Sequence, residues 1–107
     1  LPEYAADMTP FRVYICGPTD FTNYRFLERY CDRALSNKEV IIVIHDDGKT
    51  GVANLAAVYA ESRYYKTEIA SPNTQYDAVI AYRDSTYHTK AIKDAKNKGI
   101  PVKVIRY

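Results

Sequence analysis

Two periodicities that alternate along the chain most constrain what it can fold into. Short runs rich in Val, Ile and aromatic residues are typical of strands, and between them apolar residues recur at the three- and four-residue spacing of an amphipathic helix. These patterns predict strands at 11–16, 40–44, 66–70, 77–82 and 101–106, and helices at 22–36, 52–63 and 87–98. Strands that alternate with helices favour right-handed crossovers between parallel strands. The sequence therefore predicts an α/β fold with a mostly parallel five-stranded sheet flanked by helices.

The length and composition fit one ordered domain. The chain has 107 residues, of which 47% are hydrophobic and 26% are charged, as in an ordinary globular protein. Residues 1–10 show no periodicity and contain two prolines, so we expect an N-terminal arm before a single domain at 11–107. No apolar stretch approaches the roughly 20 residues that cross a bilayer. We expect a soluble, cytoplasmic protein with no membrane contact.

The charges and the potential metal ligands exclude further classes. The formal net charge of +2 and the scattered basic residues do not predict a nucleic-acid surface. The one basic run, Lys90–Lys98, has helical spacing and is expected to be a solvated helix face. Cys16 lies in a strand pattern and Cys31 on a helical apolar stripe, so we expect both to be buried, reduced thiols. Neither the cysteines nor His45 and His88 have partners at metal-ligand spacing, and we expect no metal and no cofactor.

Tyrosine is unusually frequent, with 11 residues in the chain. Several stand at positions that a core does not need: Tyr64, Tyr65, Tyr76 and Tyr87. A tyrosine ring offers a rigid apolar face with a polar tip, so such residues either pack half-buried on the surface or form contacts between subunits. We therefore expect a homo-oligomer.

Polar loops follow three of the predicted strands, at residues 17–20, 46–51 and 83–89. The carboxyl ends of parallel strands meet at one edge of a sheet, and the ligands of α/β proteins bind in the crevice there. The sequence therefore predicts a site for a small ligand at this edge.

The second loop carries residue types that suit an anionic ligand. Gly48 and Gly51 precede a helix, where glycines let the backbone approach an anion and direct N–H groups towards it, although simple turn geometry also explains them. Lys49 and Thr50 complete a GKT string. Val43 stands where the phosphate loop of nucleotide triphosphatases requires a glycine, so that class is excluded.

Titratable residues in the loops have two interpretations each. Asp46 and Asp47 either hold a cation or ribose hydroxyls, or are solvated charges. Asp20 either caps the following helix, binds a sugar, or does both, and Thr22 is the other candidate for the cap. The imidazole of His88 either donates to a phosphate or takes part in acid–base chemistry, or has no functional role.

Together these motifs resemble the SLOG superfamily of Rossmann-like nucleotide-ligand sensors, and most closely its small DUF2493 branch. The first loop of that branch corresponds here to Gly17–Phe21, and its second loop to Asp47–Gly51, followed by Leu55, Ala56, Tyr59 and Ala60. The later motifs correspond to Asp77–Ala81, Asp84, Thr89 and Gly99–Val102. The resemblance covers nearly the whole chain after residue 10 and implies a three-layer Rossmann-like domain.

The resemblance also implies a function and a site. It implies that a nucleotide-derived small molecule binds at the carboxyl edge of the sheet, in a sensor or sequestering protein of bacterial or phage type. The implied ligand-binding residues come from all three loops: Gly17, Pro18, Thr19, Asp20, Asp47, Gly48, Lys49, Thr50, Gly51, Asp84, His88 and Thr89.

Departures from the pattern weigh against catalysis. Related phosphoribohydrolases carry a glycine-rich loop with a glutamate, and no such glutamate follows Gly51. Asp47 and His88 each replace a glycine of the family. Binding without turnover is therefore expected. There are two alternatives. One is an enzyme that hydrolyses or transfers the N-glycosidic bonds of nucleosides or nucleotides, because residues 17–18 also resemble the Gly-Pro loop of that family. The other is a nucleic-acid or protein interaction module.

Overall fold

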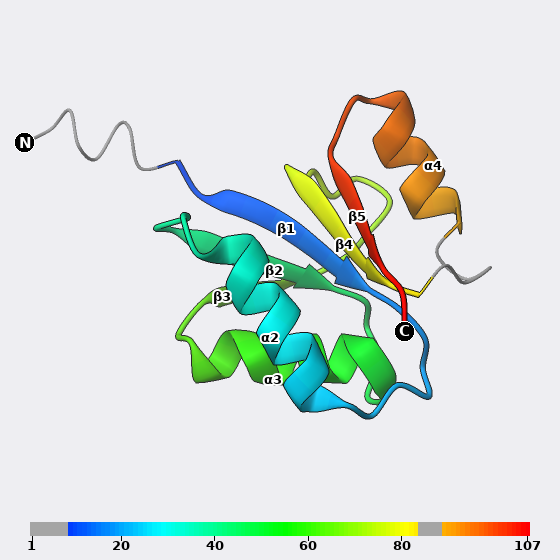
Figure 1. The fold of residues 1–107 in the computed structure, drawn as a ribbon. Coiled ribbons are helices and arrows are strands. Elements are labelled where there is room, and N and C mark those ends of the chain that lie inside the picture. The colour runs from blue at the N-terminus through cyan, green and yellow to red at the C-terminus, as the bar shows by residue number, and fades with distance from the viewer. Residues whose placement is uncertain (1–8, 84–88) are drawn as a thin grey trace, which may run out of the picture.

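The computed structural model describes residues 9–83 and 89–107, and the side chain of Thr89 lies outside this description. Within these residues strands and helices alternate in the predicted order (Figure 1). The elements are β1 (Phe11–Cys16), α2 (Tyr24–Leu35), β2 (Ile41–His45), α3 (Gly51–Ser62), β3 (Lys66–Ile69), β4 (Ala78–Tyr82), α4 (Thr89–Asn97) and β5 (Val102–Ile105). The predicted order of elements is confirmed.

The sheet is parallel throughout, with the strand order β3-β2-β1-β4-β5. Strand β1 lies at its centre, where Val13 pairs with Val43 on one side and Ala78 on the other. The chain adds strands on one side of β1 until β3 and then crosses to the other side, so the switch point lies between β1 and β4. This arrangement is a three-layer Rossmann-like domain, as predicted.

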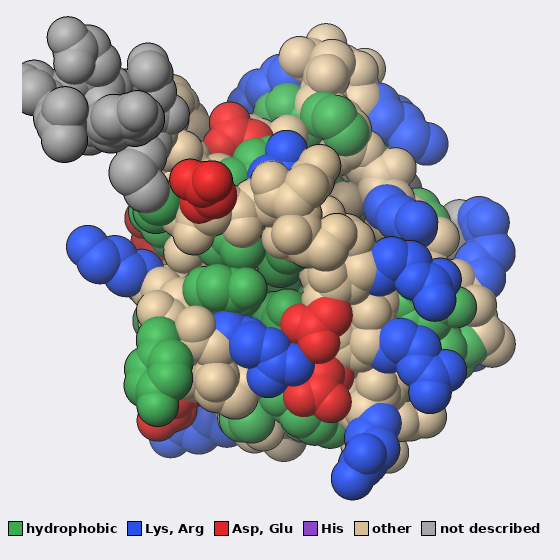
Figure 2. Space-filling view, turned by 60° about the vertical axis from the view of Figure 1, so that its left-hand side comes forward, with side chains coloured by type: hydrophobic (Ala, Val, Ile, Leu, Met, Phe, Trp, Pro, Cys, Tyr) green, Lys and Arg blue, Asp and Glu red, His purple; other side chains and the backbone are tan. Residues whose placement is uncertain are grey.

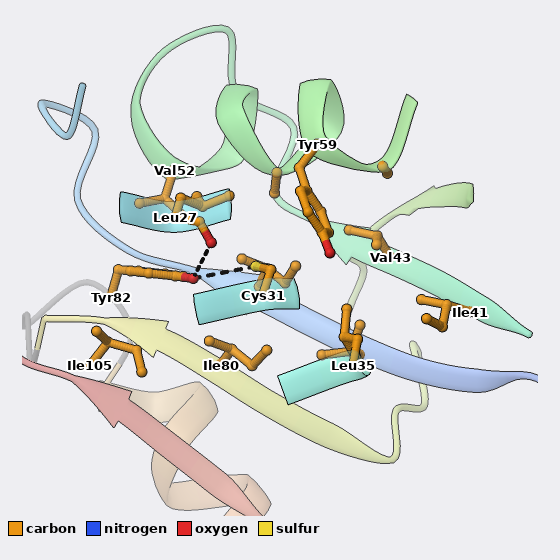
Figure 3. Close-up of a cluster of buried hydrophobic side chains, with 14 of the residues drawn as sticks. Leu27, Cys31, Leu35, Ile41, Val43, Val52, Tyr59, Ile80, Tyr82 and Ile105 are labelled. Atoms are coloured by element: carbon orange, nitrogen blue, oxygen red, sulfur yellow. Dashed lines mark hydrogen bonds between the residues drawn. The ribbon is translucent and has the colours of Figure 1, made fainter. Parts of the chain in front are cut away.

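The two faces of the sheet are covered by different helices. Because the side chains of a strand alternate, Val13 and Ile15 point to one face and Tyr14 and Cys16 to the other. Helices α2 and α3 cover the first face, and α4 packs on the second (Figure 1). Figure 3 shows the core of the first face, which includes Leu27, Cys31, Leu35, Ile41, Val43, Val52, Tyr59, Ile80, Tyr82 and Ile105.

Helix α2 begins later than the sequence predicts. Its N-cap is Asn23, whose side-chain oxygen accepts a hydrogen bond from the backbone N–H of Phe26 at 3.1 Å. The prediction that Asp20 or Thr22 caps this helix is therefore wrong. The physical reason is Phe21, which is buried with its ring 5.7 Å from that of Tyr82. Burying this ring keeps the chain in a loop for two more residues before the first helical turn forms.

The core of the first face contains polar groups that bond to one another. The Tyr82 hydroxyl donates to the backbone oxygen of Leu27 at 2.9 Å, and the Cys31 Sγ lies 3.3 Å from the same hydroxyl (Figure 3). Burial raises the pKa of the Cys31 thiol to about 12. Both Cys31 and Cys16 are buried and unpaired, which confirms the prediction of buried free thiols.

The chain returns from β3 to β4 without a helix. Residues 70–77 form this crossover on the second face, and they include a turn in which the Thr74 N–H donates to the Ser71 backbone oxygen at 3.0 Å. Arg12 of β1 holds the segment: its Nε donates to the Gln75 backbone oxygen at 2.7 Å, and its guanidinium pairs with Glu68 at 2.5 Å. A crossover this thin covers less of the sheet than a helix does.

Candidate functional site

A groove of about 360 Å³ lies on the second face of the sheet, between the crossover and α4. Its volume falls at the lower end of the range typical of small-molecule sites, about 300–1,000 Å³. The groove is lined by Tyr14, Ile44, Asp46, Ala70, Ser71, Pro72, Thr74, Tyr76, Lys90, Ala91, Asp94 and Lys98. We call this hollow the crossover groove. It exists because no helix fills the space above β1 and β2.

The floor of the crossover groove holds a tyrosine bonded to a carboxylate. Tyr14 lies near the end of β1, and Asp46 directly follows β2, so the parallel pairing of these strands places them side by side. The Tyr14 hydroxyl donates to Asp46 Oδ1 at 2.6 Å. This bond orients the carboxylate at the carboxyl end of the sheet, within the groove.

The walls of the groove combine an aromatic ring with charged groups. Tyr76, at the end of the crossover, places its ring centroid 5.6 Å from that of Tyr14, with the two planes inclined at 37°. On the other wall, α4 contributes Lys90 and Asp94, and Lys98 follows directly after the helix. A ligand in the groove therefore meets two aromatic rings, carboxylates and amines.

Tyr14 and Cys16, which lie under the groove, are held in their neutral forms. Burial, followed by the hydrogen bond to Asp46, raises the pKa of the Tyr14 phenol well above its ordinary value. Burial also raises the pKa of Cys16 strongly, with a further contribution from the charge of Asp46. Near neutral pH Tyr14 is thus a permanent hydrogen-bond donor, and Cys16 is not a thiolate nucleophile. These groups suit recognition better than covalent chemistry.

The first predicted loop packs directly against the end of the second loop and the start of α3, and leaves no space for a ligand between their backbones there. Gly51 has a φ of +66°, and a Cβ added to it would lie 2.3 Å from the Pro18 oxygen and 2.4 Å from the Thr19 Cα. The Pro18 oxygen accepts the backbone N–H of Val52 at 3.1 Å, in the first turn of α3. A Cβ on Gly17 would lie 2.6 Å from Val52 Cγ2. The close packing of the first loop on α3 therefore requires both Gly17 and Gly51.

The other predicted loop residues lie at the surface. Asp47, Gly48, Lys49 and Thr50 are exposed and do not line the crossover groove. The Gly48 N–H donates to the Asp46 backbone oxygen at 2.9 Å, so this loop is a tight turn directly beside the groove's carboxylate.

Asp20 lines a different hollow, which we call the aromatic hollow. It has a volume of about 260 Å³ and is lined by Asp20, Phe21, Thr22, Asn23, Phe26, Arg83 and Tyr107. It lies beyond the carboxyl ends of β1 and β4, on the side of α2. The structure thus separates Asp20 from the crossover groove, where Asp46 lies.

The third predicted loop is described only at its ends. Asp84 and His88 lie outside the described residues, as does the side chain of Thr89. Thr89 begins α4, and the next residue, Lys90, lines the crossover groove. The amino end of α4 therefore borders the crossover groove.

Sequence reasoning missed most of the groove. The sequence pattern predicts only a buried strand at Tyr14 and only a solvated face at Lys90–Lys98, although it singles out both Asp46 and Tyr76. The available signal was an unusually short connection between two strand patterns, at 70–77, because a crossover without a helix leaves sheet surface open.

Comparisons with family models, with curated proteins and with solved structures find no match for this chain. Membership of the SLOG superfamily therefore stays a prediction. In the part of the chain that the structure describes, no three His, Cys, Asp or Glu residues gather as metal ligands. None of the described helices is long and apolar enough to cross a membrane.

Proposed function

We propose that this protein binds a nucleotide-derived small molecule in the crossover groove and does so without turning it over. The observation that carries the proposal is the Tyr14–Asp46 pair at the groove's floor, with the Tyr76 ring beside it. A carboxylate offers about four acceptor positions, so Asp46 can accept from ribose hydroxyls while it remains bonded to Tyr14. The fold supports the proposal, since the groove opens at the carboxyl ends of β1 and β2.

The positions of the charged residues determine how the proposed ligand is oriented in the crossover groove. Helix α4 runs opposite to the strands, and Lys90 in its first turn and Lys98 just past its last turn are about 12 Å apart along its axis. The phosphate lies at the Lys90 end, where the positive end of the helix dipole adds to the ammonium charge. The ribose then lies at Asp46, and the base lies against the ring of Tyr76.

Binding can be tested with the protein as purified from cells. Native mass spectrometry should detect a co-purifying nucleotide derivative, which denaturing release then identifies. Thermal shift against AMP, ADP, ATP, NAD and ADP-ribose should find a ligand that stabilises the protein. At 100 times its Kd, a ligand adds about 2.7 kcal/mol to the free energy of unfolding, which raises Tm by about 10 °C or more for a domain of this size.

Matched variants locate the site. Asp46→Asn keeps an acceptor for Tyr14 but removes the charge, and it should weaken binding at least tenfold. Asp20→Asn removes the same charge in the aromatic hollow and should bind as the parent does. The proposal is wrong if no nucleotide shifts Tm, or if Asp46→Asn binds like the parent. Release of free base during incubation with nucleosides would instead support the N-glycosidic enzyme.

A further inference from the structure

We propose that the outer surface of α2 binds single-stranded nucleic acid, at a site distinct from the crossover groove. The groove lies on the second face of the sheet, whereas α2 covers the first (Figure 1). The proposal rests on a stripe of exposed arginines and on a row of aromatic side chains beside it. It does not depend on the proposed nucleotide function.

The arginine stripe consists of Arg25, Arg29 and Arg33. They recur every four residues, so they lie on one face of α2, about 6 Å apart along its axis. All three are exposed, on the side away from the buried Leu27 and Cys31. Figure 2 shows several Lys and Arg side chains down the right-hand side of that view, with acidic side chains nearer its middle.

The acidic residues of α2 neutralise this stripe only in part, because they pair with Arg63 instead of the stripe. This residue caps the end of α3, and its Nη2 lies 2.8 Å from Asp32 Oδ2 and 3.0 Å from Glu28 Oε2. The Tyr59 hydroxyl donates to the same Asp32 carboxylate at 2.6 Å. Among the described residues, no ion pair joins any member of the arginine stripe to a carboxylate. Counting Arg63 with the stripe gives four cations against the two carboxylates, so this surface of α2 and α3 keeps a net charge of +2.

Aromatic rings continue along the flank of the stripe. Phe26 and Tyr30 are half-buried on α2, with ring centroids 4.8 Å apart, and Tyr107 is 58% exposed with its ring 5.4 Å from that of Phe26. The Arg33 guanidinium lies 5.4 Å from the Tyr30 ring centroid. Lys103 of β5 is exposed on the same side, because it pairs with Ile80 of the first face.

This combination fits a single strand better than other polyanions. Proteins that bind single strands pair a cationic track for the phosphates with rings on which unstacked bases lie. An acidic peptide would use the arginines but not the rings, and a rigid duplex keeps its bases stacked away from them. The structure therefore favours a short single-stranded segment, with its phosphates along the stripe and a base against Tyr107.

Fluorescence anisotropy with a 5′-labelled dT12 oligonucleotide tests the inference. If three phosphates are neutralised, log Kd should change with log salt with a slope of about 2, so binding should be roughly 20-fold weaker at 200 mM than at 50 mM salt. The triple variant R25Q/R29Q/R33Q should abolish most of this slope. Its matched control, K66Q/K93Q/K96Q, removes the same charge at exposed positions of β3 and α4 and should keep the slope.

Two further measurements separate this surface from general charge attraction. Tyr107→Ser leaves every charge in place and should weaken dT12 binding about fivefold or more, because stacking on an aromatic ring is lost. A poly-glutamate peptide of equal charge should compete poorly with dT12. The inference is overturned if dT12 does not bind at 50 mM salt, if both triple variants lose affinity equally, if Tyr107→Ser has no effect, or if poly-glutamate competes as well as an unlabelled oligonucleotide.

Discussion

The packing of the first loop on α3 makes a sharp prediction about Gly51. If this glycine serves the fold, Gly51→Ala destabilises the protein in the absence of any ligand. If it serves only to let a ligand approach the backbone, the ligand-free protein tolerates the change. The two explanations therefore differ in the stability of the empty protein.

The magnitude follows from the local geometry. Holding an alanine at a φ of +66° costs about 1–2 kcal/mol. The added Cβ would lie 2.3 Å from the Pro18 oxygen, a backbone atom that cannot move aside alone, and overpacking of this kind costs about 1–3 kcal/mol. The bond from the Val52 N–H to that oxygen, worth about 1 kcal/mol, weakens as the loops separate. We expect Gly51→Ala to lower the free energy of unfolding by about 3–5 kcal/mol.

Urea denaturation followed by circular dichroism measures this change. Gly48→Ala is the matched control, because it lies in the same loop and no neighbour of its added Cβ is nearer than the Ala53 Cβ, at 3.3 Å. We expect this control to change the free energy of unfolding by less than about 1 kcal/mol. If Gly51→Ala is as stable as Gly48→Ala, the loop packing does not require a glycine, and our explanation of it is refuted.

Further predictions concern the helix cap, the acid limb of stability and the thiols. Asn23→Ala should lower the free energy of unfolding, measured by urea denaturation, by about 1 kcal/mol, because α2 loses its cap. Asp20→Ala should lower it by less than about half as much, and the reverse order would contradict the assigned cap. Hydrogen bonds from Arg63 lower the pKa of Asp32, so this carboxylate stabilises the fold above its ordinary pKa of about 3.9, and the contribution is lost as the pH falls through the lowered value. The urea midpoint of Arg63→Gln should accordingly fall less steeply between pH 5 and pH 2 than that of the parent, and parallel curves would refute this coupling. The native thiols should resist a disulfide reagent at pH 8 until the protein unfolds, because Cys31 is buried and its pKa is raised to about 12; rapid labelling in the native state would contradict this.

The candidate site was only partly predictable, because its parts come from distant positions in the chain. The sequence placed a site at the carboxyl edge of the sheet and singled out Asp46, which lies in the crossover groove. It did not connect Asp46 with Tyr14, 32 residues away, since that bond depends on the parallel pairing of β1 and β2. It also treated Lys90–Lys98 as one solvated face, although Lys90 and Lys98 border the groove.

The predicted functions of the glycines illustrate the same limit. A glycine before a helix is consistent both with an anion site and with close packing, and the residue type does not distinguish them. The structure supplies the packing reason at Gly17 and Gly51 through specific backbone and side-chain neighbours. Gly48, by contrast, lies in an exposed turn.

The sequence by itself determined the elements, their order and their buried faces. Hydrophobic periodicity is local, so β-branched runs and helical stripes specify strands and helices without knowledge of their neighbours. Only the tertiary structure decided which residue caps α2, where a groove forms and which charged side chains pair with one another. Burial of Phe21 moved the helix cap to Asn23, the short crossover left a groove above the sheet, and Arg63 bound the carboxylates of α2 from 31 and 35 residues away. Each of these results depends on contacts between elements far apart in the chain, which no local pattern records.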